Sequence, residues 1–233
     1  MAGWAVPEAA VIVLEGVGKR FGPARVLRKV DAAFPAGAVT LVTGGNGAGK
    51  STLLKIMAGL SRPSAGRVTR ATGAAGGEPR LGYVGHATFL YPGLTALENL
   101  AFWRTAHRLP LDRDALLALL ARVGLAGHAH ERARVFSRGM AQRLNLARVL
   151  MLAPDILLLD EPMTGLDAPA RELLRREIAD ARAAGACVVL VSHDLEGDGP
   201  LADRVLALAS GSVTYEGPAA AFFAHEGEGP CCA

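Results

Sequence analysis

A glycine-rich segment, residues 44–52, constrains the fold of this chain more than any other stretch. It follows the apolar run 39–42 and precedes the largely apolar run 53–58. Strand, glycine loop and helix in this order are what a phosphate-binding P-loop requires. Glycines accept positive φ, so successive backbone N–H groups can point at one phosphate, and the helix adds the positive end of its dipole. We therefore predict that the chain binds ATP or GTP.

Two side chains of this segment have chemistry that fits a nucleotide. The lysine would reach the β- and γ-phosphates, and the serine would place its hydroxyl on Mg²⁺. A glycine-rich turn that only starts a helix is the alternative, and it does not explain the lysine–serine pair. The residues expected to contact the nucleotide are Gly44, Asn46, Gly47, Ala48, Gly49, Lys50, Ser51 and Thr52.

A second chemical signal is the apolar run 156–159, which is followed by Asp160 and Glu161. The pattern predicts a buried strand that ends in two acids. Asp160 would hold Mg²⁺, directly or through water, and Glu161 would orient or deprotonate the water that attacks the γ-phosphate. Capping by the two acids would be the better explanation if the strand stood alone. Together with the glycine loop, the pair indicates ATP hydrolysis.

Composition narrows the class of protein. The chain has 233 residues, with 51% hydrophobic and 20% charged residues, which is typical of a globular protein rather than a disordered one. The net charge is only +3 and the arginines are dispersed, so we expect no nucleic-acid partner. Apolar runs are strand-sized, and no secretory signal pattern is present. Cys187 falls in a predicted buried strand, while Cys231 and Cys232 are adjacent, so a reducing cytosol is expected.

The order of predicted elements indicates an α/β fold with a helical insertion. Residues 11–16 and 26–34 read as strands, and residues 67–68 and 80–84 as a second strand pair. Thr95, Asp112 and Ser137 can each cap a helix within about residues 87–152. Further on, strands at 156–160 and 186–192 flank a helix at 169–184, which predicts parallel pairing. We expect one domain over 1–233, with a flexible tail at about 225–233.

The segment Phe136-Ser137-Arg138-Gly139-Met140 resembles the signature motif of ATP-binding-cassette (ABC) ATPases, whose usual form is Leu-Ser-Gly-Gly-Gln. Ser137 and Gly139 match that form, while Arg138 and Met140 depart from it. The family's other landmarks resemble residues here in the same order, and the resemblance covers about residues 11–217. These are Phe21 for the aromatic A-loop, Asp167 for the D-loop and His193 for the switch histidine.

The resemblance implies a fold: a P-loop NTPase core with a parallel central sheet, an N-terminal antiparallel β subdomain and an inserted α-helical subdomain. It also implies roles. Phe21 would stack on adenine, and His193 would sense the γ-phosphate. Ser137, Arg138 and Gly139 would contact the γ-phosphate bound by a second copy, in a head-to-tail dimer. Asp167 would lie in the D-loop, although it can equally cap the helix that follows.

The resemblance further implies a partner. Transport would need a separate integral membrane permease, which places the chain at the cytoplasmic face of the cell membrane. We expect Phe89, Leu90, Tyr91 and Pro92, with Phe102 and Trp103, to line a groove for a short cytoplasmic helix of that permease. Ordinary packing is the alternative for Phe102 and Trp103.

One departure suggests a cargo. His86 stands where the family has a glutamine that touches Mg²⁺ or the attacking water, and an imidazole cannot copy an amide's geometry. His86, residues 94–100 and the form of residues 136–140 resemble the ATPase subunit of the cytochrome c-maturation haem exporter. Export of a small hydrophobic cargo such as haem is the expectation. The alternatives are export of a lipid or drug-like cargo and a soluble ABC ATPase without transport function.

Overall fold

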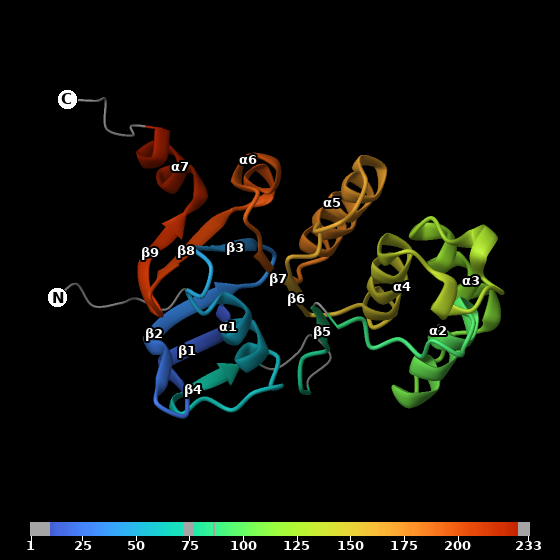
Figure 1. Cartoon of the computed structure of the whole chain (residues 1–233), viewed down its shortest axis with the longest axis horizontal. Coiled ribbons are helices and arrows are strands. Elements are labelled where there is room, and N and C mark those ends of the chain that lie inside the picture. The colour runs from blue at the N-terminus through green and yellow to red at the C-terminus, as the bar shows by residue number, and fades with distance from the viewer. Residues whose placement is uncertain (1–9, 72–76, 86, 228–233) are drawn as a thin grey trace.

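The structure is a computed structural model that describes residues 10–71, 77–85 and 87–227. Figure 1 shows two sheets with their covering helices on one side of the molecule and a lobe of helices on the other. The lobe is formed by α2 (Ala96–Ala106), α3 (Arg113–Arg122) and α4 (Arg138–Leu150), with two short 3-10 turns, η1 (Ala126–His128) and η2 (Ala133–Val135), between α3 and α4. It lies within the expected helical insertion.

The N-terminal sheet is antiparallel, with strand order β2-β1-β4. Its strands are β1 (Ala10–Phe21), β2 (Ala24–Pro35) and β4 (Ala65–Arg70). The expected pairing of residues 67–68 with 80–84 is wrong. β4 pairs with β1, whereas β5 (Leu81–Val84) pairs with β6 in the other sheet. Two short neighbouring strands carry no local signal for a hairpin when a long connection separates them.

The central sheet has the order β5-β6-β7-β3-β8-β9. Its other strands are β3 (Val39–Thr43), β6 (Ile156–Asp160), β7 (Cys187–Val191), β8 (Arg204–Ala209) and β9 (Ser212–Pro218). All pairs are parallel except β8 with β9. Every residue of β3, β6 and β7 is buried, because helices or the second sheet cover both faces.

Two apolar clusters hold these layers together. Helix α1 (Lys50–Met57) lies between the two sheets, and its leucines pack with Ile12 and Leu14 of β1 and with Val189 of β7. The other face of the central sheet packs against α5 (Ala168–Ala183) and the helical lobe. Short helices α6 (Leu195–Asp198) and α7 (Ala219–Gly227) and the 3-10 turn η3 (Gly199–Leu201) complete the chain.

The expected helix caps are present. Thr95 forms a capping box with Glu98, and the side chains of Asp112 and Ser137 accept hydrogen bonds from Ala115 and Met140. Each cap satisfies a backbone N–H that the first helical turn leaves free. None of the described helices combines the length and apolar character needed to cross a membrane.

Candidate nucleotide-binding site

The glycine loop connects β3 to α1 and is held by close backbone packing. Gly44 has φ +136°, and a Cβ there would overlap the carbonyl oxygen of Leu208. Gly49 has φ +104°, and a Cβ there would lie 2.6 Å from Leu27 Cδ2. Side chains are therefore excluded by sterics as well as by backbone conformation. The loop leads directly into the N-terminus of α1, where backbone N–H groups favour an anion.

Lys50 lies inside this loop rather than extending into solvent. Its Nζ donates hydrogen bonds to the carbonyl oxygens of Gly44 at 2.7 Å and Gly45 at 3.1 Å. Burial lowers the pKa of the ammonium group, and the nearby carboxylates of Glu161 and Asp160 oppose that shift. A buried cation fixed at the mouth of a phosphate loop is placed to meet phosphate oxygens.

The residues expected to hold Mg²⁺ are in contact with each other. Ser51 Oγ donates a hydrogen bond of 2.9 Å to Oδ1 of Asp160, whose side chain is almost completely buried. The second carboxylate oxygen, Oδ2, is buried and has no hydrogen-bond partner among the residues that the structure describes. Mg²⁺ prefers hydroxyl and carboxylate oxygens, and a buried carboxylate oxygen without a partner is costly. Ser51 and Asp160 therefore fit Mg²⁺.

Glu161 and His193 meet at the same edge of the sheet. β7 lies between β6 and β3, so the residues after these strands gather at their carboxyl ends. His193 Nε2 is 2.9 Å from Glu161 Oε1. Glu161 has φ +50°, a conformation that costs a non-glycine residue roughly 1–3 kcal/mol and is common at functional sites. The fold thus holds this carboxylate in a strained backbone, aimed at the histidine.

A hollow of about 300 Å³ brings these parts together. Glu161, His193 and the residues from Asn46 to Thr52 line it. Val26 of β2 also lines it and was not expected, because a single valine in a strand carries no functional signal. The hollow has the size of a small-ligand site, with the phosphate loop, the acid and the histidine on its walls.

The remaining expected residues do not line this hollow. Phe21 is 55% exposed at the end of β1, with Lys19 Nζ 4.9 Å from its ring centre. Ser137 and Arg138 are exposed at the start of α4, and Figure 1 places α4 on the opposite side of the central strands from α1. Asp167 caps α5 by accepting a hydrogen bond from Ala170 at 2.9 Å. His86 lies outside the described residues, as do Cys231 and Cys232.

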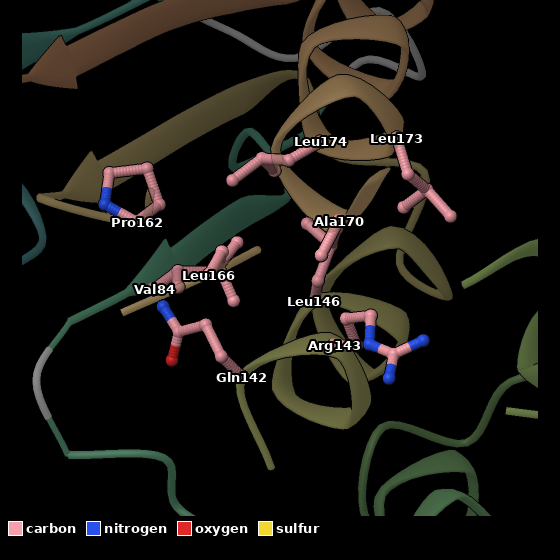
Figure 2. A pocket seen from close by; sticks show the side chains of 9 residues that line it. All are labelled: Val84, Gln142, Arg143, Leu146, Pro162, Leu166, Ala170, Leu173 and Leu174. Carbon is pink, nitrogen blue, oxygen red and sulfur yellow. The ribbon is translucent and has the colours of Figure 1, made fainter. Parts of the chain in front are cut away.

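The start of α4 contacts the segment after β6. A Cβ on Gly165 would lie 3.4 Å from Cδ and Nε of Arg138, and one on Gly139 would lie 3.6 Å from Leu166 Cδ2. Deeper in the same junction is a small apolar hollow between α4 and α5, which Figure 2 shows with Leu166 and Pro162 on its wall. The signature-like segment and the 161–167 segment therefore share one packed junction, which sequence spacing did not reveal.

Known proteins resemble this chain in both sequence and structure. The family model described as "ABC transporter" matches residues 27–164. The chain is 40% identical over 209 residues to the aliphatic sulfonates import ATP-binding protein SsuB of Mycobacterium avium (strain 104), covering 87% of this chain and 79% of that protein. It is also 40% identical over 215 residues to the molybdenum import ATP-binding protein ModC of Mycobacterium tuberculosis (strain H37Rv), covering 83% of this chain and 58% of that protein.

A solved structure described as "Structure of ATP binding subunit of ABC transporter" has the same fold. It superposes with a TM-score of 0.82 at 26% identity, and the match covers 93% of each chain. The expected P-loop NTPase core of the ABC type is confirmed.

The expectation of export, with haem as the cargo, is wrong. The relatives named above are import ATPases for aliphatic sulfonates and for molybdenum. The haem expectation rested on His86, which lies outside the described residues, and on two short segments, 94–100 and 136–140, at the starts of α2 and α4. The match to the family is broad, whereas those segments are local. By its family model and its relatives, the chain belongs to the ABC transporter family and is one of its ATP-binding subunits, an ATPase.

Proposed function

We propose that two copies of this chain close head to tail around two ATP molecules and use hydrolysis to drive transport through a separate integral membrane permease. One observation supports the dimer above all. The hollow of a single chain contains the phosphate loop, Glu161 and His193, but Ser137, Arg138 and Gly139 do not line it. A second copy can place its own Ser137, Arg138 and Gly139 against the γ-phosphate bound in this hollow.

Within each hollow, the residues divide the work on the γ-phosphate. Mg²⁺, held by Ser51 and Asp160, would neutralise charge on the phosphate oxygens. Lys50 binds the β- and γ-phosphates, and the backbone N–H groups of the loop enclose them. Glu161 accepts a proton from the attacking water, while His193 donates a hydrogen bond to the γ-phosphate and orients Glu161. His86, which lies outside the described residues, would contact the metal or the water.

Across the dimer, the start of α4 faces the partner's nucleotide. Ser137 caps α4, so the free N–H groups of the first turn and the helix dipole favour a phosphate there. Arg138 is exposed beside them and adds a positive charge. Phe21 is exposed with its ring available for stacking on adenine. Asp167 both caps α5 and lies in the segment that packs against Arg138 and Gly139.

The permease would dock on an aromatic cluster beside the helical lobe, which consists of Phe89 and Tyr91 before α2 and Phe102 and Trp103 on α2. The Tyr91 and Phe102 ring centres are 4.5 Å apart, and those of Phe102 and Trp103 are 5.5 Å apart. Phe89, Tyr91 and Phe102 are each more than 40% exposed. Partly exposed aromatic groups with fixed mutual packing are typical of a contact surface.

Arg148 connects this cluster to α4. Its guanidinium lies 5.0 Å from the Trp103 ring centre and 5.6 Å from that of Phe89. It also donates hydrogen bonds to Asn145 Oδ1 and the Tyr83 carbonyl, and burial lowers its pKa to about 10. A movement of the aromatic cluster would therefore also displace Arg148 and so disturb its hydrogen bonds to Asn145 on α4 and to Tyr83 on β5.

Replacing Tyr91 with aspartate is expected to weaken permease association about tenfold or more, because a charge in an apolar contact must be desolvated. ATP binding should remain as in the unchanged chain, since Tyr91 does not line the nucleotide hollow. The measurement is the amount of permease that co-purifies with the tagged chain from native membranes in mild detergent, identified by mass spectrometry.

Leu60→Asp is the matched control, because Leu60 is an exposed apolar residue that follows α1 rather than lying in the helical lobe. If the same amount of permease co-purified with the unchanged chain and with Tyr91→Asp, the proposal that the aromatic cluster is the docking surface would be wrong. Recovery of soluble partners alone would favour an ABC ATPase without transport function. The names of the relatives support import as the direction, and the cargo of the recovered permease would test it.

A further inference from the structure

A fully buried carboxylate, Asp198, lies close to the proposed γ-phosphate sensor and takes part in none of the roles above. Asp198 ends the short helix α6 and has no exposed surface. Its Oδ2 accepts a hydrogen bond of 2.7 Å from Ser192 Oγ, and its Oδ1 accepts one of 3.2 Å from Arg175 Nη2. A buried charge is tolerated only when it is paired and hydrogen-bonded, as this one is.

The Ser192 hydroxyl has a single proton, and Asp198 accepts it. The lone pairs of Ser192 Oγ then face the other way, where the backbone N–H of Asp194 donates to them at 3.0 Å. Asp194 is fixed in turn, because its Oδ1 accepts a hydrogen bond of 2.8 Å from the N–H of Gly197. Hydrogen bonds therefore fix Ser192 and Asp194, the two residues that flank His193 in the chain.

Arg175 connects this network to the other functional segment. It lies on α5, the helix that begins at the Asp167 cap, directly after residues 161–167. A hollow of about 280 Å³ is lined by Glu161, Thr164 and Gly165 from the segment after β6 and by His193, Asp194 and Asp198 from the segment after β7. The ion pair between Arg175 and Asp198 therefore joins α5, the helix that follows Glu161 in the chain, to the turn that carries His193.

We propose that Asp198 is a positioning residue for His193, acting through the Ser192 hydroxyl and anchored by Arg175 on α5. This inference rests on the proposed role of His193 at the γ-phosphate. The orientation of the imidazole, 2.9 Å from Glu161, then depends on a carboxylate that does not line the phosphate-loop hollow. Because misplacement of a catalytic group by about 1 Å costs up to roughly 100-fold in rate, loss of the network lowers kcat more than it alters KM.

The test compares Asp198→Asn with Glu196→Gln, a change of an exposed carboxylate on the same short helix. Asparagine keeps the shape but loses the charge that pairs with Arg175. We expect kcat to fall about tenfold with KM for ATP nearly unchanged, and Glu196→Gln to behave as the unchanged chain. Ser192→Ala should reproduce the loss without disturbing the ion pair, and Ser192→Thr should restore activity because it keeps a hydroxyl.

A double-mutant cycle with His193→Ala distinguishes an effect on the position of His193 from a general loss of stability. The rate of ATP hydrolysis is measured for each variant, in single-turnover assays where turnover is slow. The inference is supported if Asp198→Asn or Ser192→Ala lowers the rate in the unchanged chain but has no further effect beside His193→Ala. Equal fold-losses in both backgrounds, or no loss in a folded Asp198→Asn chain, would overturn it. If His193→Ala alone leaves hydrolysis unchanged, the proposed role of His193 fails instead.

Discussion

Replacing Glu161 with glutamine is expected to lower ATP turnover by about 10²–10⁴-fold, the range typical of a lost general base. The amide cannot accept a proton from water, but it keeps the length of the side chain and can still accept a hydrogen bond from His193, which is 2.9 Å from Glu161 in the structure. The strained backbone at φ +50° is the same for glutamate and glutamine, so the free energy of unfolding should change little. Turnover is measured by phosphate release and ATP affinity by equilibrium binding.

The same variant should accumulate as a dimer when ATP is present. Under the proposed cycle, ATP binding favours the closed pair and hydrolysis permits reopening, so blocked hydrolysis shifts the population toward the closed form. Light scattering after size-exclusion chromatography with MgATP measures that shift. Glu172→Gln, an exposed change on α5, is the control and should stay as monomeric as the unchanged chain. Near-native phosphate release by Glu161→Gln would remove Glu161 from its catalytic role.

Local chemistry explains why much of the site was predictable from the sequence. The glycine loop, the strand before Asp160 and the caps at Thr95, Asp112 and Ser137 each depend on residues within a few positions of one another, and all were found where expected. His193 was predicted from its resemblance to the switch histidine of ABC ATPases, and the parallel order of β6, β7 and β3 brings it to Glu161.

Strand pairing and side-chain contacts between segments that are distant in the sequence were not predictable. Strands β4 and β5 exist as expected but lie in different sheets, and β8 and β9 were not identified, because the pattern of a short strand does not say which strand it pairs with. The contact of Arg138 with Gly165 and the pair of Arg175 with Asp198 join residues that are 27 and 23 positions apart, respectively. A single arginine or aspartate on a helix carries no signal for such contacts. The cargo was misjudged for a related reason, since residues that handle nucleotide do not identify what a permease carries.

Replacing Lys50 with methionine should produce the largest loss of nucleotide binding. The ammonium group supplies charge-assisted hydrogen bonds to phosphate, worth about 1.5–3 kcal/mol, so ATP affinity should fall roughly 10–100-fold. Methionine has a similar length but no donor, so it also leaves the carbonyl oxygens of Gly44 and Gly45 without the hydrogen bonds that Nζ now provides. The loop should therefore be less stable even before nucleotide is added.

Thermal unfolding with and without MgATP separates these two effects. ATP that binds only the folded chain raises its stability by mass action, so the unchanged chain should gain in Tm and Lys50→Met should gain much less. Lys55→Met is the matched control, because Lys55 is exposed on the same helix and has no role in the site. If Lys50→Met showed the same ATP-dependent gain as Lys55→Met, the cation in the loop would not be a phosphate ligand. If Lys50→Met instead had a lower Tm without ATP but the same ATP-dependent rise in Tm as the unchanged chain, Lys50 would only stabilise the loop. In that case its ammonium group would matter for the hydrogen bonds to the Gly44 and Gly45 carbonyl oxygens and not for phosphate binding.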